Sequence, residues 1–362
     1  MKFELKNIVR KEVLNLAPYI AGVPSSNHLR LHANESSRTP DTNRDQEKNP
    51  VNRYFGIAKI LEDLICKIFG IDRQEFLVTR GSSEGVDIIT RTFCDPQKDS
   101  ILISTPTFDM YRYYAEILGV NVIDVPQVES QDTFKFPVDA VSKKIKENSN
   151  IKVLYLCTPN NPTGNSISIA DINHLCKLMM PQGIVVVDEA YIEFSSSPSM
   201  IQYIKEIPNL ILIRTMSKAY ALAGVRAGFI FSNEDVINYC SRVVPPYSCP
   251  ITTQEQIILA LQDANITESR KYIDLVKIQK NSITVSLGKN KLISNIYYSD
   301  GNFILCRFKN AEIVLNYLKD NDLLIRGFPN MRSLKQCLRI TIGKADEMDQ
   351  LVDLLKQLER KV

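Results

Sequence analysis

Short hydrophobic runs alternate with amphipathic segments through the middle of this chain. The runs are rich in Ile and Val, and several are apolar at nearly every position, as in Gly183-Ile-Val-Val-Val-Asp188. Strands that are apolar on both faces are typical of a parallel sheet covered by helices on both sides. The pattern predicts strands at 76–79, 101–104, 120–125, 153–157, 184–187, 210–214 and 228–231.

The segments between these strands repeat apolar residues at helical spacing. They predict helices at 86–93, 111–118, 138–145 and 169–179, after an earlier helix that carries Ile60, Leu61, Leu64, Ile65 and Ile68. Alternating strands and helices favour an α/β domain in which right-handed crossovers join parallel strands.

The C-terminal part of the chain has a different pattern. A long helical stretch at 252–288 precedes predicted strands at 302–308, 323–326 and 337–342 and helices at 311–319 and 348–358. This mixture predicts a smaller α+β domain beside the larger one. We expect an N-terminal arm at 1–45 that runs into a polar loop, a large domain at 46–262 and a small domain at 263–362.

Composition and charge narrow the class of protein. The 362 residues are 44% hydrophobic and 23% charged, which excludes a disordered, collagen-like or coiled-coil chain. A net charge of +3 gives no reason to expect a nucleic-acid or acidic-membrane partner. The N-terminus lacks the apolar core of a signal peptide, and no apolar run approaches the ~18 residues of a membrane span. We therefore expect a soluble, cytoplasmic protein.

Cysteine and histidine give little sign of metal or redox chemistry. The eight cysteines include no C-x-x-C pair, and most lie in apolar runs, as small buried side chains of a cytosolic protein do. The three histidines show no metal-ligand spacing, so we expect no metal.

Ligands of open parallel sheets bind at the carboxyl ends of the strands, so the polar residues that follow strands are candidates for chemistry. The segment 80–85, Arg-Gly-Ser-Ser-Glu-Gly, is either a phosphate site at a helix start or an ordinary turn with an N-cap serine. The segment 157–164, Cys-Thr-Pro-Asn-Asn-Pro-Thr-Gly, is a rigid turn that can aim an Asn amide. Asp188 ends an apolar strand, where it either caps a helix or faces a cation.

The segment 214–228 is the most informative. It places Ser217, Lys218 and Arg226 among small residues directly after a predicted strand. Lys218 is flanked by Met, Ala and Leu, so we expect it to be partly buried. Burial lowers a lysine pKa, and imine chemistry requires that.

Taken in order, these motifs resemble the fold-type I aminotransferases that use pyridoxal 5′-phosphate, and in particular the histidinol-phosphate aminotransferase family. Further matches lie at 16–19, 31–35, 52–54, 105–111 and 337–343, so the resemblance spans nearly the whole chain. It implies an α/β fold of type I, with a mainly parallel sheet between helices in a large domain and a smaller α+β domain. It also implies a homodimer.

The resemblance assigns roles to individual residues. Lys218 occupies the position of the lysine that binds the cofactor covalently and moves protons, and Asp188 that of the carboxylate at the pyridine nitrogen. Asn161 and Tyr191 match the residues that hydrogen-bond the phenolate oxygen. Phe108 stands where the family more often stacks a tyrosine on the ring.

The phosphate and substrate positions follow in the same way. The implied phosphate contacts are Ser82, Ser83, Ser217, Arg226 and, from a neighbouring subunit, Tyr54. The implied substrate contacts are Tyr19, Asn34 and Arg326, with Arg339 clamping the carboxylate of glutamate. The implied reaction moves an amino group between glutamate/2-oxoglutarate and a phosphorylated substrate, L-histidinol phosphate/imidazole acetol phosphate.

Departures from the family pattern keep alternatives open. Gly81-Ser-Ser-Glu84 replaces the usual Gly-Ala-Asp-Glu, His32 replaces an Asn, and the residues around Arg326 differ. A paralogue acting on another phosphorylated amine or ketone is one alternative, and a decarboxylase of a phosphorylated amino acid that uses the same cofactor is another. A non-catalytic module is disfavoured because the catalytic positions are retained.

Overall fold

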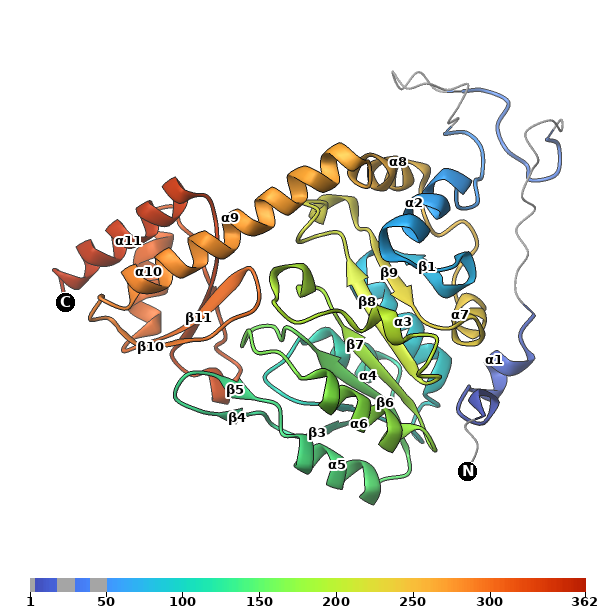
Figure 1. Cartoon of the computed structure of the whole chain (residues 1–362), viewed down its shortest axis with the longest axis horizontal. Helices are drawn as coiled ribbons and strands as arrows, with labels where there is room; N and C mark the ends of the chain where they lie inside the picture. The colour runs from blue at the N-terminus through green and yellow to red at the C-terminus, as the bar shows by residue number, and fades with distance from the viewer. Residues whose placement is uncertain (1–3, 18–29, 40–50) are drawn as a thin grey trace.

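A seven-stranded sheet forms the centre of the large lobe (Figure 1). The computed structural model describes residues 4–17, 30–39 and 51–362. The strand order is β1-β9-β8-β7-β6-β2-β3, and all neighbours are parallel except β9, which runs antiparallel to β1 and β8. The strands are β1 Phe76–Thr79, β2 Ser100–Ile103, β3 Asn121–Asp124, β6 Ile151–Cys157, β7 Ile184–Asp188, β8 Leu210–Thr215 and β9 Gly228–Phe231.

Helices cover both faces of this sheet, as the apolar strands predicted. Val185 and Val187 of β7 belong to one buried cluster, whereas Ile184 and Val186 belong to another on the opposite face. The first cluster includes residues of α2, α5 and α6, and the second includes residues of α1, α3, α4 and α7. These helices are α1 Lys11–Asn15, α2 Lys59–Phe69, α3 Gly81–Phe93, α4 Met110–Ile117, α5 Val138–Glu147, α6 Ile169–Met179 and α7 Glu234–Ser241.

The small lobe is an antiparallel sheet with helices packed on it. Its strands have the order β10-β11-β13-β12 and span Ile293–Tyr297, Phe303–Phe308, Cys337–Thr341 and Arg326–Gly327 in that order. A third buried cluster joins this sheet to α9 Asp263–Leu287, α10 Ala311–Lys319 and α11 Ala345–Glu359. The α+β character of this lobe is therefore confirmed, while the boundaries at 45 and 262 stay a prediction.

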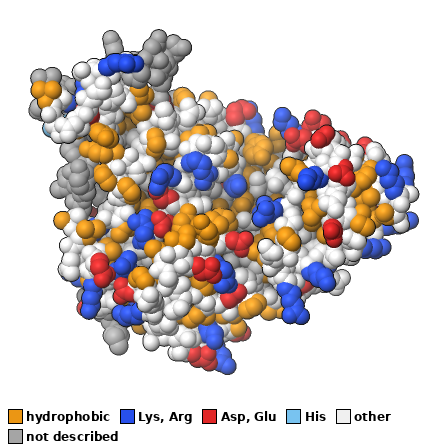
Figure 2. Space-filling model, turned by 180° about the vertical axis from the view of Figure 1, so that it is seen from behind, with side chains coloured by type: hydrophobic (Ala, Val, Ile, Leu, Met, Phe, Trp, Pro, Cys, Tyr) orange, Lys and Arg blue, Asp and Glu red, His pale blue; other side chains and the backbone are white. Residues whose placement is uncertain are grey.

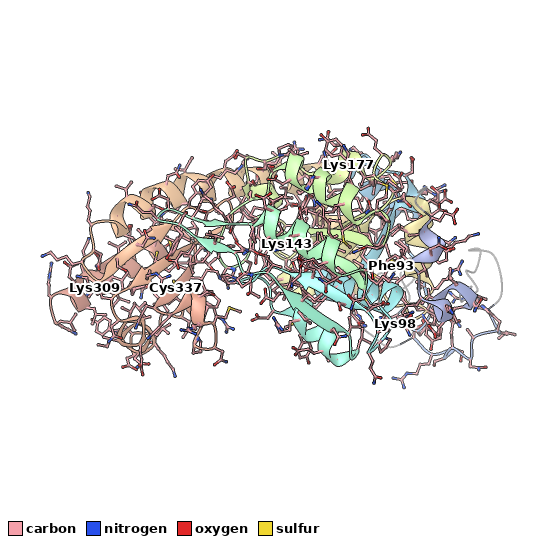
Figure 3. The ribbon with its side chains drawn as sticks, turned by 90° about the horizontal axis from the view of Figure 1, so that it is seen from below. Phe93, Lys98, Lys143, Lys177, Lys309 and Cys337 are labelled. Carbon is pink, nitrogen blue, oxygen red and sulfur yellow. The ribbon has the colours of Figure 1, made fainter. Side chains whose placement is uncertain are left out.

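Some elements differ from the sequence-based expectations. The helical stretch predicted at 252–288 is two helices, α8 Ile251–Ala260 and α9, which are separated at Leu261 and Gln262. Of the strand predicted at 323–326, only Arg326 is in a strand, the two-residue β12 Arg326–Gly327. A hairpin that was not predicted, β4 Val128–Glu129 and β5 Phe134–Lys135, extends from the large lobe to the small one (Figures 1 and 3). Short 3-10 helices lie at Leu5–Asn7, Arg73–Glu75, Ile192–Phe194, Met200–Tyr203, Ala223–Val225 and Arg332–Leu334.

The cysteines and the surface add two observations. All eight cysteines are free, and every one except Cys66 is buried, as expected from their apolar surroundings. Positive and negative side chains are interspersed over the face that Figure 2 shows. Among the described helices, none combines the length and the hydropathy that crossing a membrane requires.

Candidate active site

A cavity of about 470 Å³ lies where the carboxyl ends of β6, β7 and β8 meet the small lobe. Segments far apart in the sequence line it, as the strand-end argument predicted. Most of the predicted site residues are brought together here: Ser82, Ser83, Phe108, Asn161, Asp188, Tyr191, Ser217, Lys218, Arg226, Arg326 and Arg339.

The first turn of α3 forms one end of the cavity. Helix α3 starts at Gly81, and no side chain caps it, so Ser82 and Ser83 are not N-cap serines. The first N–H groups of a helix have no partner within the helix and attract anions. Glu84 does not compete for them, because its carboxylate accepts hydrogen bonds from the backbone N–H and the Nε of Arg80 at 2.6 and 2.7 Å.

Two glycines let a guanidinium approach this helix start. A Cβ on Gly81, whose φ is +74°, would lie 2.7 Å from Nη2 of Arg226. A Cβ on Gly228 would lie 2.8 Å from the backbone nitrogen of Ser82. Arg226 itself has a left-handed φ of 58°, and its Nη1 donates to the carbonyl of Ala223 at 3.0 Å. The backbone donors and the cation converge on a place suited to a phosphate.

Asp188 lies at the other end of the cavity, at the end of β7, and only 2% of it is exposed. Its Oδ1 accepts from the backbone N–H of Ala190 at 3.1 Å, and its Oδ2 accepts from the hydroxyl of Tyr111 at 2.7 Å. Burial raises its pKa from 3.8 to about 6. A buried carboxylate with two neutral donors and no cation beside it favours a positively charged partner.

Tyr111 is a site residue that the sequence analysis did not assign. It is fully buried, and its ring stacks on Tyr155 at a centroid distance of 4.7 Å. Phe108 meets the edge of the same ring at 5.6 Å. The helical spacing of Tyr111 could have predicted its burial, but its partner Asp188 lies on another element, so no local pattern revealed the hydrogen bond.

Lys218 follows β8 and lines the same cavity. Its Nζ lies 5.9 Å from the ring centroid of Tyr191. Burial, followed by the nearby Arg339 and Arg226, lowers the pKa of Lys218, as expected from its apolar neighbours in the sequence. A lower pKa increases the share of neutral amine, which is the nucleophilic form.

Asn161, Tyr191 and Arg339 form the wall toward the small lobe. Nη1 of Arg339 donates to Oδ1 of Asn161, and the guanidinium lies 5.5 Å from the ring of Phe303. Burial raises the pKa of Tyr191 and lowers that of Arg339. Amide, phenol and guanidinium thus supply donors along one side of the cavity.

A second buried network supports the site from behind. Arg214, in β8, donates from Nε to Glu189 at 2.8 Å and from Nη1 to Glu193 at 2.9 Å. Glu189 directly follows Asp188, and Arg214 lies four residues before Lys218. The network therefore fixes the ends of β7 and β8 relative to each other. Sequence analysis missed it, since its partners are 21 and 25 positions apart.

Two of the predicted residues that the structure describes do not line the cavity. Tyr54 is 49% exposed and stacks on Tyr247 at 4.6 Å. Asn34 is exposed and has a φ of 53°. Tyr19 lies outside the described residues. Their roles stay predictions.

The residues present fit pyridoxal 5′-phosphate. The buried carboxylate of Asp188 suits a protonated pyridine nitrogen, and the helix start with Arg226 suits the phosphate. Lys218, with its lowered pKa, lines the same cavity and suits the aldehyde. The close approach that Gly81 and Gly228 allow is compatible with such an anion site, because a side chain at either position would collide with its donors.

Known proteins place the chain in a family. Residues 25–355 match the family described as aminotransferase class I and II. The histidinol-phosphate aminotransferase 2 of Idiomarina loihiensis is 36% identical over 97% of this chain and 98% of its own.

Solved structures agree with the sequence matches. The histidinol-phosphate aminotransferase from Clostridium acetobutylicum has a TM-score of 0.74 and 25% identity, with 84% of this chain and 89% of that chain covered. The enzyme from Sinorhizobium meliloti, solved in complex with pyridoxal 5′-phosphate, has a TM-score of 0.74 and 22% identity, with 86% and 84% covered, and shares the fold. The chain therefore belongs to the class I and II aminotransferases of fold type I, which use pyridoxal 5′-phosphate, and within them to the histidinol-phosphate aminotransferase family.

Proposed function

We propose that this protein exchanges an amino group between glutamate/2-oxoglutarate and L-histidinol phosphate/imidazole acetol phosphate, with pyridoxal 5′-phosphate as cofactor. The observation that carries the proposal is the cavity in which Lys218, Asp188 and the anion site of α3 and Arg226 converge. The name of the curated relative, similar over nearly the whole chain, supports the choice of substrate.

The chain's residues divide the work of this reaction. The bound cofactor supplies an electron sink for the electrons released at the substrate Cα. Asp188 holds the pyridine nitrogen protonated, which keeps that sink effective. Asn161 and Tyr191 donate to the phenolate oxygen, and Phe108 orients the ring. Nζ of Lys218 accepts the proton from the substrate Cα.

Two arginines of the small lobe support substrates that carry two anionic groups. Arg326 and Arg339 are register partners on β12 and β13, and both line the cavity. One guanidinium can bind the α-carboxylate of glutamate through two parallel hydrogen bonds. The second can bind a phosphate or a side-chain carboxylate of the substrate.

A homodimer with shared sites is part of the proposal. Large apolar side chains stand exposed in the segment around Tyr54, namely Leu31 at 84%, Ile57 at 37% and Ile60 at 58%. A second copy covering this segment would bury them and could bring Tyr54 to the cofactor phosphate of the neighbouring subunit.

A half-reaction assay tests the proposal. Glutamate added to the holoenzyme should convert the visible cofactor band to that of the pyridoxamine form, and imidazole acetol phosphate should restore it. L-Histidinol, which lacks the phosphate, is the matched control and should react far more slowly than L-histidinol phosphate. Turnover with other phosphorylated amines but not with L-histidinol phosphate would favour a paralogue. Release of CO2 without conversion by glutamate would favour the decarboxylase alternative.

A further inference from the structure

Four of the five residues in the loop between β10 and β11 are buried, all except Tyr298, which is unusual for a connection between two strands. We call residues 298–302 the tie loop. Ser299 is 6% exposed, Asp300 8% and Asn302 9%, whereas most loops run over the surface. The tie loop belongs to the small lobe, yet it lies against the turn of the large lobe that carries Asn161.

Direct hydrogen bonds join the tie loop to this turn. The backbone N–H of Asp300 donates to the carbonyl of Gly164 at 2.8 Å. The hydroxyl of Ser166 donates to Oδ2 of Asp300 at 2.6 Å. Gly164 has a φ of +82°, and a Cβ there would lie 2.7 Å from the backbone Cα of Ser299. The two segments are therefore in backbone contact.

The turn behaves as one closed unit. The backbone N–H of Asn160 donates to the carbonyl of Asn165 at 2.8 Å, and that of Gly164 donates to the carbonyl of Asn160 at 2.7 Å. The side chain of Asn160 also donates to the carbonyl of Pro106 at 2.8 Å. A displacement at Gly164 is therefore transmitted to Asn161 within the same turn.

Lys280 of α9 holds the tie loop from the other side. Its Nζ donates to the carbonyls of Ser299 at 2.6 Å and of Gly301 at 2.8 Å. Burial lowers the pKa of Lys280, as expected for an ammonium in contact with the protein interior. A lysine used in this way is uncommon, because most lysines extend into solvent. Oδ1 of Asp300 accepts from the hydroxyl of Tyr298 at 2.7 Å, so both carboxylate oxygens of Asp300 are hydrogen-bonded.

We propose that Lys280 and Asp300 are positioning residues that act through the tie loop to aim the side chain of Asn161 at the phenolate oxygen of the cofactor. The inference rests on the proposed function, because it assigns Asn161 to the cofactor. Arg339 also contacts Asn161 through one nitrogen, and its remaining donors are available to a substrate carboxylate. The tie loop gives the turn a second contact with the small lobe that does not depend on that guanidinium.

The pH at which the bound cofactor changes its visible absorbance reports on the placement of the Asn161 side chain. A donor at the phenolate stabilises the deprotonated form of the bound cofactor, so a misplaced Asn161 raises the pKa of that transition. In the holoenzyme, Lys280→Met should raise it by about 0.7 pH unit, the equivalent of losing one hydrogen bond. Lys271→Met is the matched control: it lies on the same helix, and its ammonium pairs with Glu268 at 2.7 Å on the surface and makes no contact with the tie loop among the described residues, so it should cause no shift.

A double-mutant cycle separates positioning from general loss of stability. In an Asn161→Ala background, Lys280→Met should cause no further shift, because the group it positions is gone. An equal shift in both backgrounds, or no shift in either, would overturn the inference while leaving the proposed function standing. If Lys280→Met does not fold, Ser166→Ala removes one hydroxyl of the tie and carries the same test. A wild-type holoenzyme without a visible cofactor band would overturn the proposed function and this inference together.

Discussion

Two residues of the cavity, Asp188 and Lys218, have pKa values that differ from those of the same side chains in water. Asp188 loses hydration at the end of a buried strand, and Lys218 is largely buried, with the guanidinium groups of Arg339 and Arg226 nearby. The carboxylate therefore favours a cationic partner, while the lysine more readily becomes a neutral amine. Both pKa shifts reflect charges that are costly in the cavity. Binding a ligand that carries an anionic group and a protonatable nitrogen offsets that cost.

Asp188 should make the cofactor-free protein less stable as the pH rises. Its pKa of about 6 in the folded chain exceeds its ordinary value of 3.8, so the folded state binds the proton more tightly than the unfolded state. This contribution is present below pH 4 and is lost as the pH passes 6; the difference in pKa corresponds to about 3 kcal/mol. Denaturant unfolding across this range, compared with Asp188→Asn, measures it. Parallel curves for the two proteins would contradict the assignment.

The same substitution should reduce turnover of the holoenzyme. An asparagine at this position would keep the shape of the side chain but could not stabilise a protonated pyridine nitrogen, so we expect Asp188→Asn to lower kcat by at least ~10³-fold, or about 4 kcal/mol of barrier. Steady-state kinetics with saturating substrates checks this. Near-native kcat would mean that the carboxylate serves only to accept the hydrogen bonds of Ala190 and Tyr111.

Lys218 should be the single site of covalent attachment of the cofactor. Borohydride treatment of the yellow holoenzyme should fix the cofactor to Lys218, as peptide mass spectrometry would show. Lys218→Ala should lose turnover by several orders of magnitude and still bind the cofactor non-covalently, because the phosphate and ring contacts remain. Attachment at another lysine would disprove the assignment.

At the scale of elements, the start of α3 and the antiparallel strand β9 depend on each other. Gly228 opens β9 and lies against the first turn of the helix, and Arg226, two residues earlier, places its guanidinium over Gly81. An anion site that joins a helix start to a strand start requires small residues on both, since backbone must approach backbone.

Gly81→Ala tests this arrangement. The new methyl group would displace the guanidinium of Arg226 and strain a left-handed residue, so we expect the affinity for the cofactor to fall about 10-fold. Gly70→Ala is the matched control, because its φ of +69° is similar but nothing lies within 4 Å of its Cβ position. Both variants should lose about 1–2 kcal/mol of stability, and Gly70→Ala should keep the affinity. Fluorescence titration measures the cofactor, and an equal loss in both variants would rule out the displacement.

Sequence patterns predicted most helices and strands because the spacing of hydrophobic residues in these segments matches the period of the element that forms there. The predicted strands 76–79 and 228–231 and the helices 169–179 and 311–319 coincide with β1, β9, α6 and α10. The direction of β9 was not predictable, since a short apolar run has no direction. The two-residue strands β4 and β5 show no period, and the break between α8 and α9 falls at Leu261-Gln262 without a Gly or Pro.

For the site, motifs predicted which residues line the cavity but not how they are supported. Lys218, Asp188, Asn161 and Arg226 follow from motif order, and the structure brings them together. The hydrogen bond from Tyr111 to Asp188 spans 77 positions of the chain, and the hydrogen bonds from Lys280 to the β10–β11 connection join two elements of the small lobe that are 19 and 21 positions apart. Such partners are set by the fold, so a local pattern does not contain them.

At the scale of the whole molecule, the cavity of one chain is lined by most of the predicted site residues that the structure describes, but not by Tyr54. The segment with Tyr54 is held by Glu35, which accepts from the backbone N–H of Tyr54 at 2.7 Å and from Arg53 at 3.1 Å. The side chain of Tyr54 stacks on Tyr247, and the residue is nevertheless 49% exposed. A position that is fixed by its backbone and open at its side chain suits a contact with a second copy.

Mixed dimers test whether sites are shared. Tyr54→Ala and Lys218→Ala protomers, each inactive alone, should regain activity when they are mixed, because one site of the heterodimer combines the native Lys218 with the native Tyr54. Subunit exchange followed by mass measurement confirms that mixed dimers formed. Dimers that form and stay inactive, or a fully active monomer, would show that Tyr54 does not act across an interface.

The position of Arg326 has a consequence for how this protein can diversify. Asp188 and Lys218 depend on the ends of β7 and β8, whose register inside a seven-stranded sheet leaves no freedom. Arg326 lies instead on a two-residue strand at the outer edge of the small sheet, and only β13 pairs with it. Substitutions in that edge segment can therefore accumulate without disturbing the chemistry. A lineage could change which phosphorylated compound it accepts while remaining a working enzyme at every step.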